Sequence, residues 1–405
     1  MDLPRSCDVL VIGAGPAGSS SAALLSQAGY SVAVVEKQNF PRFVIGESLL
    51  PHCMDLLAEA NLLEAVRARD YIIKRGALFL RGDDRCDFNF RDQHTNGWDH
   101  TWQVPRADFD KTLADAVAAR GVPFAYEQEV TAVDLSSKPK ATVVDREGHA
   151  QEISARFVID ASGYGRVLPR LLSLDAPSNF PQRKAVFTHL RGDRRPEGPE
   201  VNRIWVVLPK GGAWVWIIPF SNGVTSYGVV GDSGVFAQFP ADSEACLRAV
   251  IASDHNLARL VDTEFIFPPR VLEGYACSVK RVHGDNFCLV GNATEFLDPV
   301  FSSGVTLALA SANRASKAVM RQLAGESVDW ESDYARPMKL GTNVFRTYVS
   351  TWYDGTLPRI FFSPVVAESV KRMICSVLAG YVWDESNPFV AQHERKVAQV
   401  ARLAA

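Results

Sequence analysis

The residues close to the N-terminus constrain the fold most strongly. A β-branched run at residues 8–12 leads into the loop GAGPAG at residues 13–18, and residues 19–29 have the composition of a helix that ends at a glycine. A second β-branched run occupies residues 31–35, with Glu36 at its end. A strand, a G-x-G-x-x-G turn, a helix and a strand with an acidic end form the fingerprint of a dinucleotide-binding unit. The sequence therefore predicts an α/β fold that begins with a Rossmann-type domain.

Each residue of this fingerprint has a physical role. Gly13 permits the tight turn, Gly15 lets the backbone approach a pyrophosphate, and Gly18 lets helix and strand pack closely. The helix start offers free N–H groups to the phosphates. Glu36 can accept hydrogen bonds from ribose hydroxyls, and its charge favours a ribose without a 2′-phosphate, as in FAD or NAD.

Length, charge and cysteine usage limit the other possibilities. The chain has 405 residues, a net charge of −3 and seven scattered cysteines without a C-x-x-C pair. The length allows about two or three domains, and the charge does not favour nucleic acid. The cysteine pattern argues against a disulfide framework or a metal site and indicates a reducing compartment. We find no signal peptide and no run of roughly 18 apolar residues, so we expect a cytoplasmic protein with no transmembrane segment.

The middle of the chain is mostly extended and predicts an inserted sheet. In the run WVWIIP, the side chains of Trp214, Trp216 and Ile218 share one face, because strand residues alternate with period two. Packing in a sheet core is the alternative for each tryptophan. The connection PKGG at residues 209–212 predicts a hairpin before this strand. We predict three parts: an FAD-binding domain at residues 1–175 and 275–330, an antiparallel β-sheet substrate domain at 176–274, and a helical C-terminal region at 331–405.

Residues 291–304, GNATEFLDPVFSSG, form a second turn rich in glycine, proline and serine. An apolar run precedes this turn, and a helical pattern of small residues follows it. A helix start of this kind presents free N–H groups that favour an anion or the polar edge of a cofactor.

Two cations have positions that leave their roles open. Lys74 follows Ile72 and Ile73, so its side chain either points inward or is solvated. Arg106 stands near a predicted helix start, where it can reach a phosphate or flavin edge or can pair with Asp108 or Asp110.

Together these stretches resemble the flavin-dependent halogenases, within the wider class of flavoprotein monooxygenases. The glycine loop, Glu36, Arg106 and the DASG stretch at residues 160–163 match the FAD contacts of that class. WVWIIP matches the halogenase motif W-x-W-x-I-P, and residues 296–304 match the second motif, F-x-x-P-x-x-S-x-G. Lys74 falls where the family has its reactive lysine, and the GES stretch at residues 46–48 resembles the loop before it.

The resemblance implies a set of site residues. The implied FAD-binding residues are Gly13, Gly15, Ala17, Gly18, Glu36, Lys37, Arg42, Glu47, Ser48, Arg106, Val130, Asp160, Gly163, Asn292, Pro299, Gly304 and Val305. The backbone of Ser303 and Gly304 is the implied halide site. The implied substrate and tunnel residues are Trp214, Trp216, Ile218, Pro219 and Phe301.

The resemblance also implies a reaction. A partner flavin reductase supplies reduced FAD, which reacts with dioxygen to give a flavin hydroperoxide. Chloride or bromide attacks the hydroperoxide to give hypohalous acid, and Lys74 receives the acid and directs electrophilic halogenation of an aromatic ring. The two tryptophans would separate flavin from substrate and so disfavour hydroxylation.

Two positions bear on the substrate. Phe301 stands where tryptophan-specific relatives carry a glutamate, so we expect a phenolic or pyrrolic substrate, free or bound to an acyl carrier protein. Asn292 stands where many relatives of this type have aspartate. Two other functions stay open: a hydroxylase or geranylgeranyl-reductase-like oxidoreductase that uses NAD(P)H, and a flavin-binding protein without catalysis.

Overall fold

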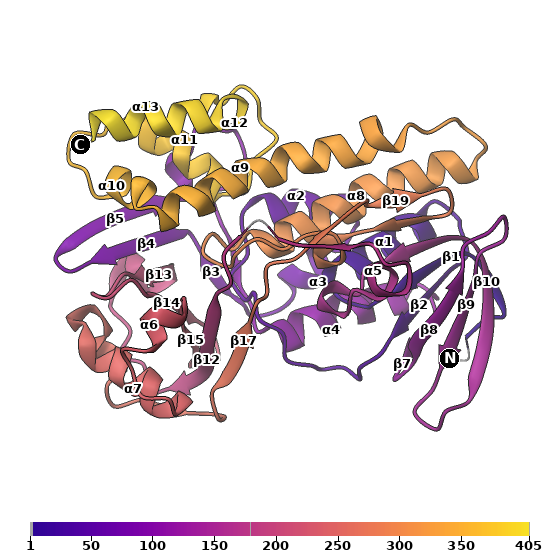
Figure 1. Ribbon diagram of the computed structural model, residues 1–405, viewed down its shortest axis with the longest axis horizontal. Helices are drawn as coiled ribbons and strands as arrows, with labels where there is room; N and C mark the ends of the chain where they lie inside the picture. The colour runs from indigo at the N-terminus through magenta and orange to yellow at the C-terminus, as the bar shows by residue number, and fades with distance from the viewer. Residues whose placement is uncertain (1–2, 179, 405) are drawn as a thin grey trace.

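The protein is elongated, with one sheet at each end and a layer of helices along one long side. The structure, a computed structural model, describes residues 3–178 and 180–404. In Figure 1, the sheet that contains the N-terminal strand lies on the right and the second sheet on the left. The last helices, in yellow and orange, lie along the top and reach the second sheet.

Among the described residues, the first sheet has eight strands with a parallel centre. Its order is β19-β20-β10-β1-β2-β7, and β9 pairs with both β10 and β8. The parallel register aligns Ile12 with Val35 and with Asp160, so the carboxyl ends of these strands meet at one edge. Ligands of open α/β sheets bind at such an edge. The strands are β1 (Ser6–Ile12), β2 (Val32–Glu36), β7 (Phe124–Tyr126), β8 (Glu129–Asp134), β9 (Lys140–Val144), β10 (Ala150–Asp160), β19 (His283–Gly284) and β20 (Phe287–Leu289).

Helices cover one face of this sheet with a continuous apolar core. The core includes Val9, Val11 and Val34 of the sheet together with Leu25 and Leu309 of two covering helices. The covering helices are α1 (Pro16–Gln27), α2 (His52–Glu59), α3 (Leu63–Arg67), α4 (Arg106–Ala118) and α8 (Ser303–Leu323). The short helix α5 (Val167–Leu171) packs on the opposite face, where Leu168 shares an apolar cluster with Leu10 and Val35. The prediction of a Rossmann-type domain is confirmed.

The second sheet is largely antiparallel, with the order β16-β12-β15-β14-β13-β4-β5 and β17 beside β12. Its strands β4 and β5 come from residues 76–89, so the sheet also draws on chain that precedes the predicted 176–274 domain. The domain boundaries themselves stay predictions. The strands are β4 (Gly76–Arg81), β5 (Asp84–Asn89), β12 (Lys184–Arg191), β13 (Arg203–Val207), β14 (Trp214–Pro219), β15 (Val224–Gly231), β16 (Glu264–Phe265) and β17 (Arg270–Glu273).

The alternation predicted for β14 is confirmed. Trp214, Trp216 and Ile218 belong to one apolar cluster, whereas Val215 and Ile217 belong to another on the opposite face. The predicted hairpin is present, since β13 and β14 pair antiparallel. The helices α6 (Ser233–Phe236) and α7 (Ser243–Ser253) follow β15.

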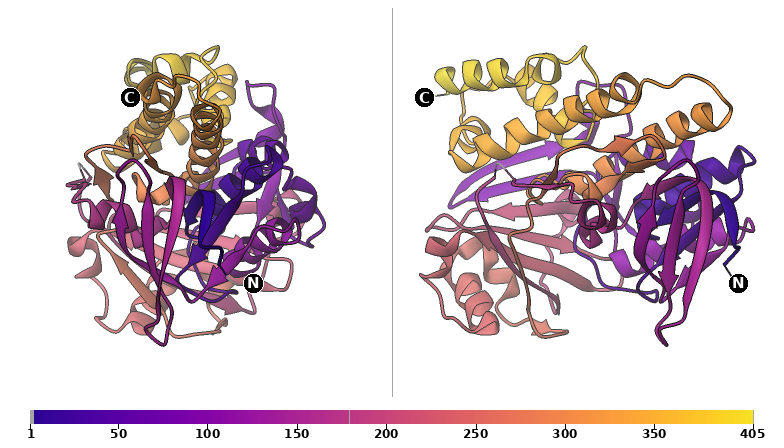
Figure 2. Two further views of the ribbon diagram at one scale, coloured as in Figure 1. Left: turned by 90° about the vertical axis from the view of Figure 1, so that its right-hand side faces the viewer. Right: turned by 45° about the vertical axis from the view of Figure 1, so that its right-hand side comes forward.

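The C-terminal region is helical as predicted and packs on the tryptophan face of the second sheet. Val344, Phe345 and Trp352 share an apolar cluster with Trp214 and Trp216. Both views in Figure 2 show these helices above the sheets. The elements are η6 (Glu331–Ala335), α9 (Arg336–Tyr353), α10 (Thr356–Phe361), α11 (Glu368–Leu378), α12 (Pro388–Ala391) and α13 (His393–Leu403).

The apolar pattern at residues 55–67 predicts one amphipathic helix, and this prediction is wrong. The chain instead forms α2 and α3, because Asn61 between them has a φ of 53° and interrupts the helix. Asparagine tolerates this left-handed conformation better than most residues. Two short ladders complete the fold: β3 (Ile72–Lys74) with β6 (Thr101–Gln103), and β11 (Asp175–Ala176) with β18 (Ser278–Val279). No described helix is long and apolar enough to cross a membrane.

Candidate active site

A cavity of about 600 Å³ is lined by residues of both sheets. The carboxyl ends of β1 and β2 contribute to it, as do the loop at residues 42–48, the face of β14 and the start of α8. Many residues implied by the resemblance line it: Gly15, Ala17, Glu36, Lys37, Arg42, Glu47, Ser48, Arg106, Val130, Gly163, Trp214, Trp216, Ile218, Asn292, Pro299, Gly304 and Val305.

Other expected site residues lie outside this lining: Gly13, Gly18, Lys74, Asp160, Pro219, Phe301 and Ser303. The Phe301 ring meets Tyr348 and Trp352 edge-on, at centroid distances of 6.1 and 5.7 Å. Phe301 therefore packs against the C-terminal helices.

In the glycine loop, Gly13 and Gly18 have no room for a side chain, whereas Gly15 has room and lines the cavity. A Cβ on Gly18 would lie 1.9 Å from the carbonyl oxygen of Gly13, and a Cβ on Gly13 would lie 2.5 Å from that of Ala161. A Cβ on Gly15, in contrast, would lie 3.4 Å from the nearest atom, in the Arg42 guanidinium. No described side chain caps the start of α1 at Pro16, so its first N–H groups are available to an anion.

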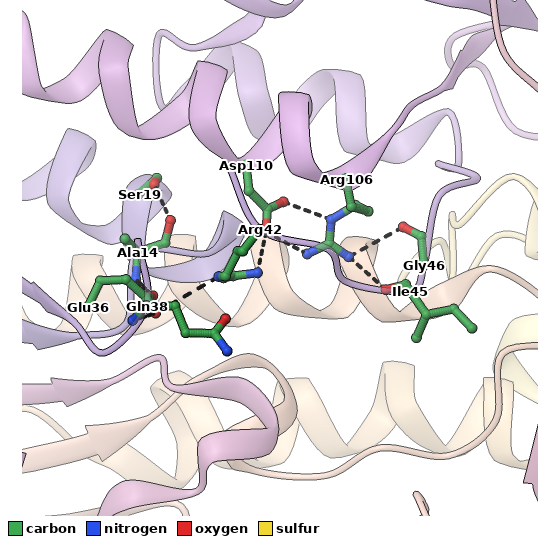
Figure 3. A network of polar contacts seen from close by, with 9 residues as sticks. All are labelled: Ala14, Ser19, Glu36, Gln38, Arg42, Ile45, Gly46, Arg106 and Asp110. Atoms are coloured by element: carbon green, nitrogen blue, oxygen red, sulfur yellow. Dashed lines mark hydrogen bonds and ion pairs between the residues drawn. The ribbon is translucent and has the colours of Figure 1, made fainter. Parts of the chain in front are cut away.

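Glu36 joins the loop to the end of β2. Its carboxylate accepts hydrogen bonds from the N–H groups of Ala14 and Gln38, each at 2.9 Å (Figure 3). A carboxylate oxygen has more than one acceptor position, so both oxygens keep capacity for a ribose hydroxyl. Lys37 beside it is exposed and pairs with Glu129 at 2.7 Å.

A network of buried and partly buried charges connects the loop at residues 42–48 to α4 (Figure 3). Arg106 donates to both oxygens of Asp110, at 2.7 and 3.0 Å, and to the carbonyl of Ile45 at 3.1 Å. Arg42 donates to the same Asp110 carboxylate at 3.2 Å. Burial alone would lower the pKa of Arg106, but Asp110 outweighs it and the pKa is raised. Of the two partners predicted for Arg106, Asp110 is the one that it pairs with. The Arg106 side chain also lines the cavity, so contact with a phosphate or flavin edge is compatible with this pairing.

The GES stretch contributes a second buried contact. Glu47, which is 2% exposed, forms a 2.8 Å contact with Nε2 of His189 on β12. Asp160 fixes the turn that follows β10, because it accepts the N–H groups of Ser162 and Leu168 at 2.8 and 2.6 Å. Burial raises the pKa of Asp160, and these hydrogen bonds oppose the shift.

The second motif ends at an uncapped helix start. Ser302 has a φ of 56°, and α8 begins at Ser303 with no side-chain cap among the described residues. Gly304 lines the cavity, and a Cβ there would lie 3.3 Å from the Phe296 ring. The arrangement can hold a small anion by backbone N–H groups.

Lys74 lies in the interior, so the inward alternative is confirmed. Its side chain is 1% exposed, and Nζ donates to the carbonyl oxygen of Leu49 at 2.8 Å. Nζ also lies 5.4 Å from the centroid of the Phe90 ring. Burial lowers the pKa of Lys74 to about 7, with a small opposing effect from Cys53. An amine of this kind is uncharged in large part near neutral pH and is nucleophilic.

Comparison with known proteins identifies the family. Residues 6–335 match the FAD binding domain family. The chain is 29% identical to the 1H-pyrrole-2-carbonyl peptidyl-carrier-protein chlorinase of Pseudomonas fluorescens, over 96% of this chain and 92% of that protein. It is 30% identical to the flavin-dependent halogenase armH3 of Armillaria mellea, over 82% of this chain and 70% of that protein. This chain belongs to the flavin-dependent halogenases.

A solved structure is closer still in sequence. The crystal structure of a flavoprotein/dehydrogenase from Cytophaga hutchinsonii is 51% identical, with a TM-score of 0.96 over 98% of both chains. The armH3 halogenase and this solved protein are both flavin proteins by name.

The cavity residues of this halogenase fit FAD. The open Gly15, the uncapped start of α1 and the Glu36 carboxylate supply a close backbone approach, phosphate donors and a ribose acceptor. Arg42 adds a cation next to the open glycine.

Reasoning from the sequence missed several residues of the halogenase site. His189, which contacts Glu47, has no local sequence signal. Asp110, in contrast, is one of the two partners predicted for Arg106, and it lies four residues after Arg106 on α4. Asp298, next to Pro299 in the second motif, and Tyr353, at the end of α9, form a hydrogen bond that lies outside the cavity lining, next to the lining residues Pro299 and Trp214. Tyr353 has no local sequence signal.

Proposed function

We propose that this protein uses reduced FAD and dioxygen to oxidise chloride or bromide, and that Lys74 delivers the halogen to a phenolic or pyrrolic ring. The observation that carries the proposal is the Lys74 amine, buried in the interior with its pKa lowered to about 7. No carboxylate of the described residues pairs with Lys74. A buried lysine of this kind is costly for stability, so its presence favours a catalytic role.

Reduced FAD and dioxygen together would oxidise the halide. When bound, reduced FAD supplies two electrons, so that FADH2, O2, halide and one proton give FAD, hypohalous acid and water. A separate flavin reductase would supply the reduced cofactor. Gly15, Glu36, Arg42 and the start of α1 would bind it.

The start of α8 is the proposed halide site. Backbone N–H groups at Ser303 and Gly304 suit chloride or bromide, because an uncapped helix start attracts an anion. Gly304 has no side chain to cover them.

Lys74 would then receive the halogen. Its uncharged amine either holds hypohalous acid by a hydrogen bond or attacks it to form an N–halogen bond, releasing water. Transfer of the halogen to the ring replaces a ring proton and regenerates the amine. The apolar surroundings, with Phe90 on one side, exclude water that would compete.

The substrate proposal rests on a relative and on one residue. The Pseudomonas fluorescens relative acts on a pyrrole-2-carbonyl group attached to a peptidyl carrier protein. Phe301 supplies no carboxylate at its position in the second motif, which argues against free tryptophan. We therefore propose a pyrrole or phenol, with a carrier-bound acyl group as the first choice.

The test is reconstitution with FAD, a flavin reductase, NADH, dioxygen and chloride or bromide. Mass spectrometry should find halogenated products from pyrrole-2-carbonyl carrier protein or from phenols, and much less from free tryptophan. A second candidate, direct oxidation of NAD(P)H without halide, is favoured by the dehydrogenase name of the Cytophaga hutchinsonii protein. Rapid NAD(P)H oxidation without a reductase, with no halogenated product, would establish that candidate instead.

A further inference from the structure

The two tryptophans of β14 are held in different ways. The Trp216 indole N–H donates to Ser226 Oγ on the neighbouring strand at 3.0 Å, and its ring lies over Gly228. The Trp214 indole N–H instead donates to the hydroxyl of Tyr353, 2.8 Å away at the end of α9. Both rings line the cavity, with centroids 5.9 Å apart. One is therefore fixed within the sheet, and the other from the C-terminal helices.

The Tyr353 hydroxyl also binds Asp298 of the second motif. It donates to Oδ2 of Asp298 at 2.9 Å, and Tyr275 donates to the same oxygen at 3.1 Å. The N–H of Val300 donates to the other carboxylate oxygen at 3.0 Å. Asp298 is 1% exposed, so each hydrogen bond compensates part of the cost of burying its charge.

The groups around the Asp298 carboxylate favour its charged form and hold the Tyr353 phenol beside it. Burial raises the pKa of Asp298 to about 6, whereas Tyr353, Val300, Arg183 and Tyr275 oppose the rise. The guanidinium carbon of Arg183 lies 3.3 Å from the centroid of the Tyr353 ring. A cation over the ring helps hold the phenol in place.

We propose that Tyr353 is a positioning residue, which ties the Trp214 indole to the loop before α8 and so controls how much reduced flavin yields hypohalous acid. The inference rests on the proposed function and adds to it a role for the C-terminal helices. Without the hydroxyl, the buried indole N–H loses its acceptor. An unsatisfied buried donor costs free energy, and this cost favours rotation of the Trp214 ring away from the cavity wall.

Two balanced outcomes compete for the same two electrons. In the productive one, FADH2, O2, halide and a proton give FAD, hypohalous acid and water. In the unproductive one, FADH2 and O2 give FAD and hydrogen peroxide. A displaced indole opens the wall of the cavity that Gly304 of the proposed halide site also lines, and this favours the second outcome.

The experiment compares Tyr353→Phe with Tyr275→Phe in the FAD-loaded protein. Each substitution removes one hydroxyl from Asp298, but only Tyr353→Phe deprives Trp214 of its acceptor. The measurement is the ratio of hypohalous acid, trapped by a diketone, to hydrogen peroxide. We expect a fall of about tenfold for Tyr353→Phe, the equivalent of one hydrogen bond, and less than about twofold for Tyr275→Phe. Adding Tyr353→Phe to Trp214→Phe should change the ratio no further.

A spectroscopic readout separates this inference from the proposed function. Ultraviolet resonance Raman difference spectra against Trp214→Phe isolate the band that reports hydrogen bonding of this indole. The band should indicate a weaker bond in Tyr353→Phe and be unchanged in Tyr275→Phe. An unchanged band in Tyr353→Phe, an unchanged ratio, or an equal loss in both variants would overturn the inference. If the wild-type protein makes peroxide alone, the proposed function fails and the control of the ratio with it, while the band still decides whether Tyr353 holds the indole.

Discussion

Arg106 and Lys74 are both buried cations, yet their surroundings act on them in opposite directions. Arg106, which is 7% exposed, faces the Asp110 carboxylate, and its pKa is raised. Lys74, which is 1% exposed, faces the Leu49 carbonyl and the Phe90 ring, and its pKa falls to about 7. Burial opposes the charge in both cases, so the carboxylate partner decides the result.

In the proposed function, this difference assigns the paired cations to cofactor binding and the lone amine to chemistry. The paired cations at the FAD end, Arg42 and Arg106, tie the loop at residues 42–48 to Asp110 of α4. Lys74 has no carboxylate partner among the described residues, and its pKa of about 7 suits the nucleophilic role that we propose for it.

The strongest test of this contrast removes the amine. Lys74→Met should reduce ring halogenation by at least about a hundredfold, because a positioned catalytic group contributes that much or more. Oxidation of reduced flavin should continue at the wild-type rate. Product mass spectrometry beside stopped-flow absorbance of the flavin measures both.

Lys140→Met is the matched control, since Lys140 is exposed and pairs with Glu152 on the neighbouring strand of the first sheet. It should leave both rates unchanged. Full halogenation by Lys74→Met would remove the lysine from the mechanism and leave the two buried cations without a functional distinction.

The opposite test breaks a paired cation. Arg106→Met leaves Asp110 buried with one fewer partner, which should cost about 3–5 kcal/mol of unfolding free energy. Urea unfolding followed by circular dichroism measures the loss. Arg67→Met, which removes an exposed pair with Glu64, should cost less than about 1 kcal/mol. Equal losses in the two variants would contradict the structural role of the buried network.

Much of the FAD end could be predicted from the sequence because its signals are local. The glycine loop, the helix and Glu36 lie within one short segment, and each has a spacing set by backbone geometry. The face shared by Trp214, Trp216 and Ile218 follows from alternation along one strand.

The remainder depends on contacts between distant segments. Arg42 and Asp110 are 68 residues apart, and Trp214 and Tyr353 are 139 apart, so no local pattern links them. The direction of Phe301 could not be predicted either, because it follows from the packing of α9 against the second motif.

The smallest effect expected from the contrast is a pH dependence. The fold lowers the pKa of Lys74 from 10.5 to about 7, so the uncharged amine predominates above about pH 7 and is lost as the pH falls. From pH 7 to pH 6 its fraction falls from about a half to about a tenth, so ring halogenation should fall about fivefold.

Trapped hypohalous acid, which is formed before Lys74 acts, serves as the internal reference. The ratio of ring halogenation to trapped acid removes the pH dependence of the flavin steps. A ratio that stays constant between pH 6 and 8 would show that protonation of Lys74 does not limit transfer. The same shift predicts that stability rises with pH between about 7 and 10.5, because in that range the unfolded lysine binds a proton that the folded one has lost.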